Sequence, residues 1–273
     1  MDGSRPLTAV WDTPWLYTWF APWALSLWAA ATHHGVRGAM ALWVHVACVW
    51  ALAMCVGVDM WALGWLRKNP VTGQRSWLAR GVVAPATAIV HLVALLYRWA
   101  LSGSQRDTSV PRVVFRSQEW QVVVGPLHRV AAFDPLTTVL LDVQEELESP
   151  PGFTLVNYVG CCAVDDRLPA AQDLGQALAK VRARLAYVTA GHCPQTVYVA
   201  CLFGASRSAL VASLLIEHLT SASPDPESRA VTPWADALAV IRTRRPGTTA
   251  LDVVKLHGAF MQAVISKASE MDT

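Results

Sequence analysis

Long uncharged runs dominate the first hundred residues of the chain. No charged residue occurs between Asp12 and Arg37, and two further apolar runs follow, the first of them interrupted by Asp59. A run of about 20 apolar residues has the length of a membrane-crossing helix. The pattern predicts three transmembrane helices in an N-terminal membrane domain of residues 1–104. The expected spans are residues 13–32, 39–63 and 81–100.

After about residue 105 the pattern changes to short β-rich runs that alternate with helical spacing. Residues 169–190 place Leu174, Leu178 and Leu185 on one face of a helix. Alternating strands and helices predict an α/β domain over residues 105–273, with a central, partly parallel sheet flanked by helices. The expected strands are residues 112–117, 120–124, 138–143, 154–162 and 196–200. The expected helices are residues 169–190 and 208–219, followed by one that starts at Thr232 and Pro233.

Composition separates the same two parts. Of the 13 tryptophans, 11 lie at or before Trp99. Residues 1–101 carry a net charge of +4 and residues 102–273 a net charge of −2. Aromatic residues at the ends of apolar runs are typical of membrane interfaces, so we expect a multi-pass membrane protein with the lipid bilayer as a partner. Basic residues number five on each side of the predicted membrane, so they do not fix its orientation.

The sequence from Cys201 to Ser208 reads Cys-Leu-Phe-Gly-Ala-Ser-Arg-Ser and lies between an expected strand and an apolar helix. Backbone N–H groups at such a helix start stabilise an anion, whether a phosphate or a thiolate. Cys201 is therefore the candidate nucleophile. Arg207 can bind a phosphate through two parallel hydrogen bonds, and Ser208 can donate to the sulfur. The candidate phosphate-binding residues are Leu202, Phe203, Gly204, Ala205, Ser206 and Arg207.

In this setting Cys-x5-Arg resembles the signature of protein tyrosine phosphatases, of the small dual-specificity type. The resemblance extends from about Val122 to Ala263. The pair Glu145–Glu146 and the segment Val197–Val199 are most similar to the lipid-directed branch, which includes the mitochondrial phosphatidylglycerophosphate phosphatase. Further similar segments are Val124–Leu127, Val139–Glu146 and Ile241–Pro246.

The resemblance implies a phosphomonoester hydrolase that works through a thiophosphoryl intermediate on Cys201. It implies no metal and no cofactor, and a substrate that is a phosphoprotein (Tyr, Ser or Thr) or a phospholipid headgroup. It also implies a general acid on a separate loop, for which Asp165 is the first candidate and Asp166 the reserve. A reactive thiol needs a reducing compartment, so we expect the catalytic domain on a cytosolic or matrix side.

The chain departs from the family at Ala200, where a histidine usually precedes the cysteine. Weakened activity is one consequence, and a phosphate-binding pseudophosphatase with a regulatory or scaffolding role is the alternative. Two other features keep two interpretations each. Glu145 and Glu146 either order the loop through Arg207 or are surface charges. Cys161 and Cys162 either form a reversible disulfide with Cys201 or are small buried strand residues. No clustering of basic with aromatic residues indicates nucleic-acid binding.

Overall fold

Two compact units make up the chain. In the computed structural model the first unit contains Met1–Arg67 and Arg75–Val93, and the second contains Lys68–Gln74 and Ala94–Thr273. The segment 68–74, which the sequence pattern places in the N-terminal domain, packs within the second unit. The described residues are 28, 32, 35–55, 67–69, 71–102, 104, 108–117, 119–153, 156–161, 170–188, 195–221, 232–248 and 258–270.

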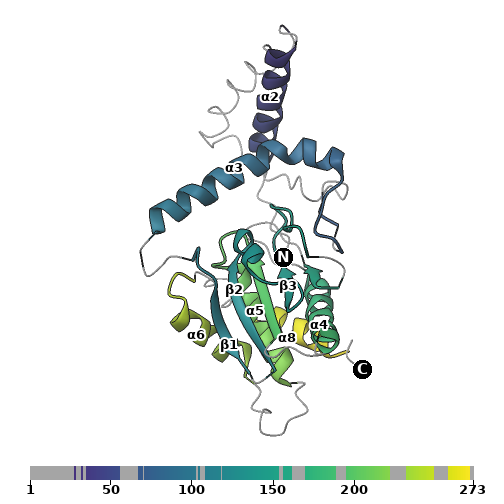
Figure 1. Ribbon diagram of the computed structural model, residues 1–273, viewed down its shortest axis with the longest axis vertical. Helices are drawn as coiled ribbons and strands as arrows, with labels where there is room; N and C mark the ends of the chain where they lie inside the picture. The colour runs from purple at the N-terminus through teal and green to yellow at the C-terminus, as the bar shows by residue number, and fades with distance from the viewer. Residues whose placement is uncertain are drawn as a thin grey trace. The chain divides into compact units, whose positions relative to one another are not determined.

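A five-stranded sheet forms the centre of the second unit (Figure 1). Its strands are β1 (Arg112–Arg116), β2 (Trp120–Pro126), β3 (Thr138–Asp142), β4 (Tyr158–Gly160) and β5 (Gln195–Cys201). The spatial order is β1-β2-β5-β3-β4, and every neighbouring pair is parallel except β1 with β2. Every residue of β3 and β5 is buried, as expected for parallel strands covered on both faces.

The register brings three strand ends together at one edge of the sheet. Pro126 at the end of β2 pairs with Cys201, and Asp142 at the end of β3 pairs with Ala200. Because these strands are parallel, the segments that leave them emerge side by side around the end of β5. In open α/β sheets this carboxyl edge is where ligands bind. The candidate nucleophile therefore lies between two neighbouring strand ends.

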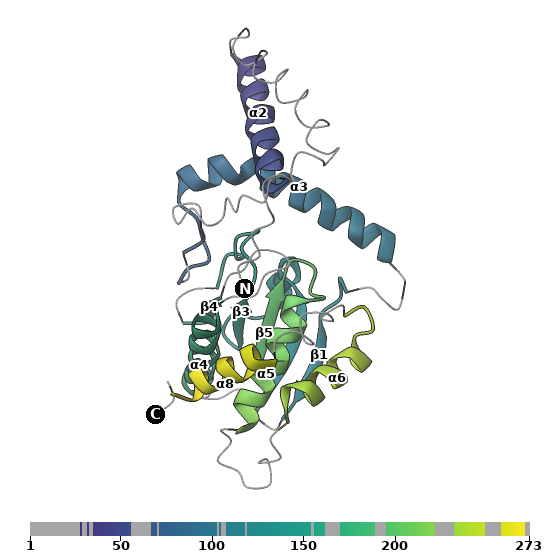
Figure 2. The same cartoon turned by 180° about the vertical axis from the view of Figure 1, so that it is seen from behind.

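Helices cover one face of this sheet, and Figure 2 shows them in front of it. They are α4 (Ala171–Val188), α5 (Arg207–Ser221), α6 (Trp234–Arg244) and α8 (Gly258–Glu270). Alternate strand residues such as Val197 and Val199 pack against Leu174, Leu178 and Leu214 in a single core. The opposite face of the sheet carries the short 3-10 helix η4 (Leu127–Ala132), which contacts β2 and β5.

One helix start differs from its sequence pattern. We expected Thr232 to cap the helix with Pro233 as its first residue, whereas α6 begins at Trp234 with Pro233 in the capping position. Proline offers no side-chain acceptor, and the Trp234 N–H is satisfied instead by the Glu217 carboxylate of α5, at 2.7 Å. A tertiary contact therefore replaces the local cap that the sequence indicated.

The structure contradicts the predicted membrane helices. Among the described residues, no helix combines the length and the apolar character needed to cross a bilayer. Span 39–63 corresponds to α2 (Val36–Cys55), and span 81–100 to α3 (Trp77–Leu101). Span 13–32 lies almost wholly outside the described residues. The prediction of transmembrane helices at 39–63 and 81–100, and with it that of a multi-pass membrane protein, is therefore wrong.

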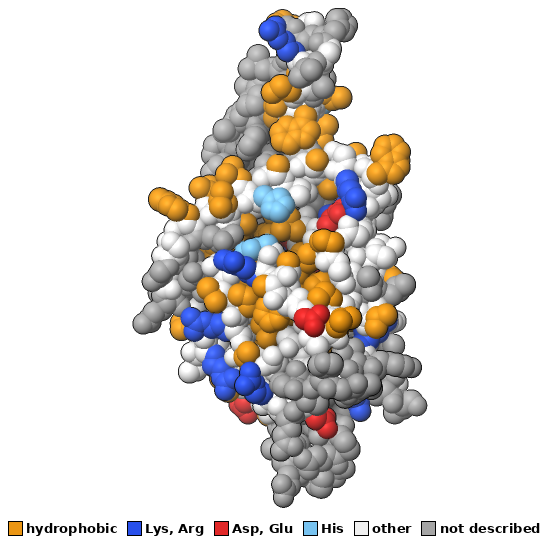
Figure 3. Space-filling view, viewed as in Figure 1, with side chains coloured by type: hydrophobic (Ala, Val, Ile, Leu, Met, Phe, Trp, Pro, Cys, Tyr) orange, Lys and Arg blue, Asp and Glu red, His pale blue; other side chains and the backbone are white. Residues whose placement is uncertain are grey.

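The physical reason lies in the polar side chains within both runs. α2 contains Arg37 and His45, and α3 contains Arg80 and His91. Both helices nevertheless expose large apolar side chains, some of which are visible in Figure 3. These are Met40, Leu42, Trp43, Val44 and Val49 on α2, and Trp77, Leu78, Leu92, Leu95, Leu96 and Trp99 on α3.

The contact between α4 and α8 yields a stability prediction. A Cβ on Gly175 would lie 2.9 Å from Lys267 Cβ and 3.1 Å from the Val264 carbonyl oxygen. We expect Gly175→Ala to lower the free energy of unfolding by about 1–3 kcal/mol, because the overpacking outweighs the gain in helix propensity. Urea denaturation followed by circular dichroism measures this change.

The matched control is Gly81→Ala in α3, where the added Cβ meets no atom within 4 Å. This control should leave stability unchanged or raise it by about 0.5–1 kcal/mol. A Gly175→Ala variant as stable as the wild type would show that α8 moves away from α4 at little cost.

Candidate functional site

The loop after β5 folds around the sulfur of Cys201. The residues 201–207, called here the cysteine loop, connect the end of β5 to the first residue of α5. The Gly204 N–H donates a hydrogen bond to Cys201 Sγ over 3.1 Å, and Ser208 Oγ lies 3.3 Å from the same sulfur. Donors converging on one buried atom stabilise negative charge there. The structure thus brings together Cys201, Gly204 and Ser208, as the motif requires.

Gly204 is a position where the loop admits no side chain. Its φ of +67° is in the left-handed region, which glycine adopts without strain. A Cβ there would lie 2.5 Å from the carbonyl carbon of Gly125 and 2.6 Å from the nitrogen of Pro126. The end of β2 therefore forms a wall behind the cysteine loop, and glycine is required for the two backbones to approach so closely.

Tyr198 and Arg245 hold this wall in place. The Tyr198 hydroxyl donates to the Pro126 carbonyl over 2.9 Å, and the buried Arg245 guanidinium donates to the carbonyls of Val124 and Thr108. Burial raises the pKa of the Tyr198 phenol above its ordinary value, and the positive charge of Arg245 offsets part of that rise. The phenol therefore remains protonated and can act as a donor.

The Arg207 side chain is buried and forms a bidentate ion pair with a carboxylate. Its Nη2 lies 3.0 Å from Glu146 Oε1, and its Nη1 donates to Glu146 Oε2 over 3.3 Å. Both side chains are about 5% exposed (5% for Arg207 and 6% for Glu146), so Glu146 is not a surface charge. A bidentate pair of this kind fixes the plane of the guanidinium. Of the two interpretations given for the glutamate pair, the ordering of Arg207 is the one that Glu146 fulfils.

Glu146 belongs to a buried turn that follows β3. The residues 142–147, called here the carboxylate loop, include Asp142, Glu145 and Glu146, all of them buried. Lys68 reaches this loop from the segment 68–74, and its Nζ lies 2.7 Å from Asp142 Oδ2. The sequence pattern gave Lys68 only as a basic residue between two apolar runs. The one available signal was the turn-forming stretch after it, Asn69–Gly73.

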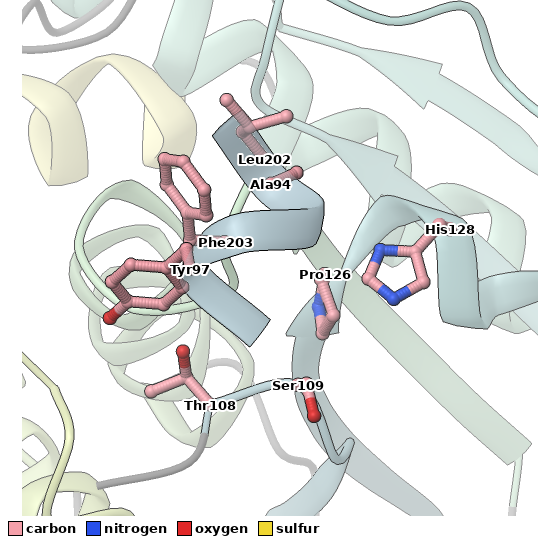
Figure 4. A pocket seen from close by; sticks show the side chains of 8 residues that line it. All are labelled: Ala94, Tyr97, Thr108, Ser109, Pro126, His128, Leu202 and Phe203. Atoms are coloured by element: carbon pink, nitrogen blue, oxygen red, sulfur yellow. The ribbon is translucent and has the colours of Figure 1, made fainter. Parts of the chain in front are cut away.

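A small, shallow recess of about 10 Å³, partly open to solvent, borders the cysteine loop (Figure 4). Leu202 and Phe203 of the loop form one side of it, and Tyr97 from the last turns of α3 lies against Phe203 with ring centroids 4.7 Å apart. The other lining residues are Ala94, Thr108, Ser109, Pro126 and His128. The recess is mainly apolar and aromatic, and it has room for about one water molecule.

The described residues bear on the predicted disulfide of Cys161 but not on the predicted general acid. Asp165, Asp166 and Cys162 lie outside the described residues. Cys161 directly follows Gly160, which pairs with Asp142, and Asp142 in turn pairs with Ala200 next to Cys201. The two cysteines are thus separated by two strand spacings, roughly 10 Å, whereas a disulfide requires Cα atoms within about 7 Å. Cys161 is a buried cysteine that the strand spacing keeps apart from Cys201.

Several solved structures resemble this chain at low sequence identity and low TM-score. Similar solved structures include PTPMT1 in complex with PI(5)P, with 15% identity, a TM-score of 0.40 and coverage of 59% of this chain and 96% of that chain. Tk-PTP in its active form has 14% identity and a TM-score of 0.38, with 58% and 96% covered. No protein-family model matches the sequence, and no curated protein does.

The close approach at Gly204 yields a binding prediction. Gly204→Ala places a Cβ into the backbone of β2 and strains a positive φ, so the loop must move away from the sulfur. We expect affinity for inorganic phosphate to fall at least tenfold, about 1.4 kcal/mol, as measured by isothermal titration calorimetry.

Gly152→Ala is the matched control. Gly152 also has a positive φ, +100°, but its added Cβ meets only Pro135 Cγ, at 3.3 Å. It should carry a similar backbone strain of about 1–3 kcal/mol and leave phosphate affinity unchanged. Equal phosphate binding by Gly204→Ala and the wild type would refute the role of this glycine.

Proposed function

We propose that the protein is a cysteine-dependent phosphomonoester hydrolase of the dual-specificity type. The observation that supports it best is the cysteine loop, in which the Gly204 N–H and the Ser208 hydroxyl lie at Cys201 Sγ and Arg207 begins the following helix. A phosphate bound there lies at the N-terminus of a 15-residue helix, whose dipole stabilises its negative charge. Arg207 supplies the positive charge, and Cys201 the nucleophile.

The proposed reaction has two steps on one sulfur. The Cys201 thiolate attacks phosphorus, the bond from phosphorus to the ester oxygen breaks, and a general acid protonates the leaving oxygen. A water molecule, deprotonated by the same carboxylate, then attacks the thiophosphoryl phosphorus and releases inorganic phosphate. The sulfur leaves as a thiolate, which the Gly204 N–H and the Ser208 hydroxyl can stabilise. Asp165 is the proposed acid, and Asp166 is the reserve.

The proposed substrate is a phosphomonoester on a protein side chain or on a phospholipid headgroup. The loop side chains Leu202, Phe203 and Ala205 are apolar, and the recess beside them is lined with Tyr97 and Pro126. Such a surface favours a single phosphate on an apolar or aromatic carrier over a highly charged polyphosphorylated headgroup. Rates on a phosphotyrosine peptide and on phosphatidylglycerophosphate, compared with the same preparation, distinguish the two classes.

A pseudophosphatase is the second candidate, and Ala200 is the observation that favours it. Ala200 is fully buried between Gly125 of β2 and Asp142 of β3. It therefore supplies no ring to orient the loop from below. Phosphate binding without turnover between pH 5 and 8 would identify this function.

The nucleophile is tested by Cys201→Ser in the full chain. The wild type should hydrolyse p-nitrophenyl phosphate, and the variant should lose at least about 10³-fold in kcat, because a neutral hydroxyl replaces the thiolate. Cys161→Ser is the matched control, since Cys161 is also a buried cysteine but lies two strands away. It should retain kcat. Full activity of Cys201→Ser would exclude the proposed mechanism.

The general acid is tested by comparing Asp165→Asn with Asp166→Asn. The removal of the acid should lower kcat by roughly 10²–10⁴-fold on an alkyl phosphate, whose leaving oxygen must be protonated. The loss should be smaller on p-nitrophenyl phosphate, because nitrophenolate leaves without a proton. We expect this pattern for Asp165→Asn and a change of less than about threefold for Asp166→Asn. The reverse pattern assigns Asp166, and the absence of an effect in both variants refutes the assignment of the acid to this pair.

A further inference from the structure

A lysine from far upstream is buried beside the phosphate site. The side chains of Lys68 and Asp142 both have 0% exposure, and Lys68 Nζ lies 2.7 Å from Asp142 Oδ2. The same ammonium donates to the Leu147 carbonyl over 2.9 Å. A charge so deeply buried is stable only when it is paired and hydrogen-bonded. Lys68 and both ends of the carboxylate loop therefore fix one another.

The carboxylate loop is also bonded to the Lys68 backbone and to itself. The Lys68 N–H donates to Glu145 Oε1 over 2.6 Å. The Gln144 side chain spans the turn, because its amide donates to the Leu147 carbonyl over 2.7 Å and accepts from the Leu147 N–H over 2.8 Å. The turn is thus held from outside by Lys68 and from inside by Gln144.

This network ends at the guanidinium of Arg207. The Glu145 N–H donates to Glu146 Oε2 over 3.0 Å, and the Glu146 carboxylate holds both terminal nitrogens of Arg207. A continuous series of hydrogen bonds therefore runs from the Lys68 backbone N–H through Glu145 and Glu146 to Arg207, while the Lys68 side chain holds both ends of the same loop. Supporting residues that are held rigidly determine how accurately a binding group such as this guanidinium is oriented.

Charge balance supports the same role. Asp142 pairs in the sheet with Ala200, the residue before Cys201. Without the ammonium of Lys68, Asp142 would be a buried carboxylate with its main counter-charge removed, close to the place where a phosphate dianion binds. Like charges in a buried site repel strongly, because the surroundings screen them poorly.

We propose that Lys68 is a positioning residue of the phosphate site, which holds the carboxylate loop so that Glu146 aims the Arg207 guanidinium at the phosphate. Lys68 acts through Glu146 and does not touch the substrate. Its importance for catalysis rests on the proposed function, but its effect on phosphate binding is measurable without turnover. The segment 68–74 is then part of the active site, although it lies well upstream of the resemblance to phosphatases.

The test is Lys68→Met in the full chain, which removes the charge and keeps most of the volume. We expect the Kd for inorganic phosphate and the KM for p-nitrophenyl phosphate to rise about tenfold, with kcat reduced less than about threefold. Val264→Ala, in the buried core of α8, is the control: it should lower the urea midpoint and leave the phosphate Kd unchanged. Lys68→Gln, which keeps a donor toward Asp142, replaces the methionine variant if that variant does not fold.

A double-mutant cycle with Glu146→Gln tests the route. Both residues act through one guanidinium. The phosphate Kd of the double variant should therefore lie within about threefold of that of the single variant that binds phosphate less tightly. Effects that multiply, or a folded Lys68 variant that binds phosphate like the wild type, overturn the inference. A wild type that binds phosphate without hydrolysing it refutes the proposed hydrolase, while the same pattern of Kd values still supports the role of Lys68.

Discussion

The buried ion pair between Glu146 and Arg207 connects the two loops on which the site depends. Each loop leaves the carboxyl end of a parallel strand, so the strand register already brings them side by side. A buried guanidinium must be paired, and a buried carboxylate must be too, so neither loop can be placed without the other. The other buried groups of the site also have partners. Lys68 forms an ion pair with Asp142 on one side, and Arg245 donates a hydrogen bond to a carbonyl of β2 on the other.

The sequence predicted well those features that depend on neighbouring residues. The strands were located within a few residues, and the helix after the cysteine loop was expected at 208–219 and is found at Arg207–Ser221. Cys201, Gly204 and Ser208 could be named together because eight consecutive residues carry the whole arrangement. Local spacing sufficed there, because the loop and helix that position these groups are formed by the same residues.

Features that depend on distant pairing could not be predicted in this way. Lys68 and Asp142 are 74 residues apart in the chain, and no local pattern connects them. Arg245 was named only within a segment similar to phosphatases, without its bonds to Val124 and Thr108. The predicted membrane helices failed for a different reason, since the apolar runs contain polar and charged side chains such as His45, Arg80 and His91.

The path of the chain between its two units has a consequence for how such a protein can evolve. The backbone leaves the first unit at Lys68, returns to it at Arg75 and leaves it again at Ala94. The second unit is therefore encoded in two separate stretches, and the shorter one carries a buried counter-charge. Gene fusion or exon shuffling that copied only the longer stretch would transfer a domain with an uncompensated aspartate in its core. A complete second unit is therefore inherited only together with the segment 68–74.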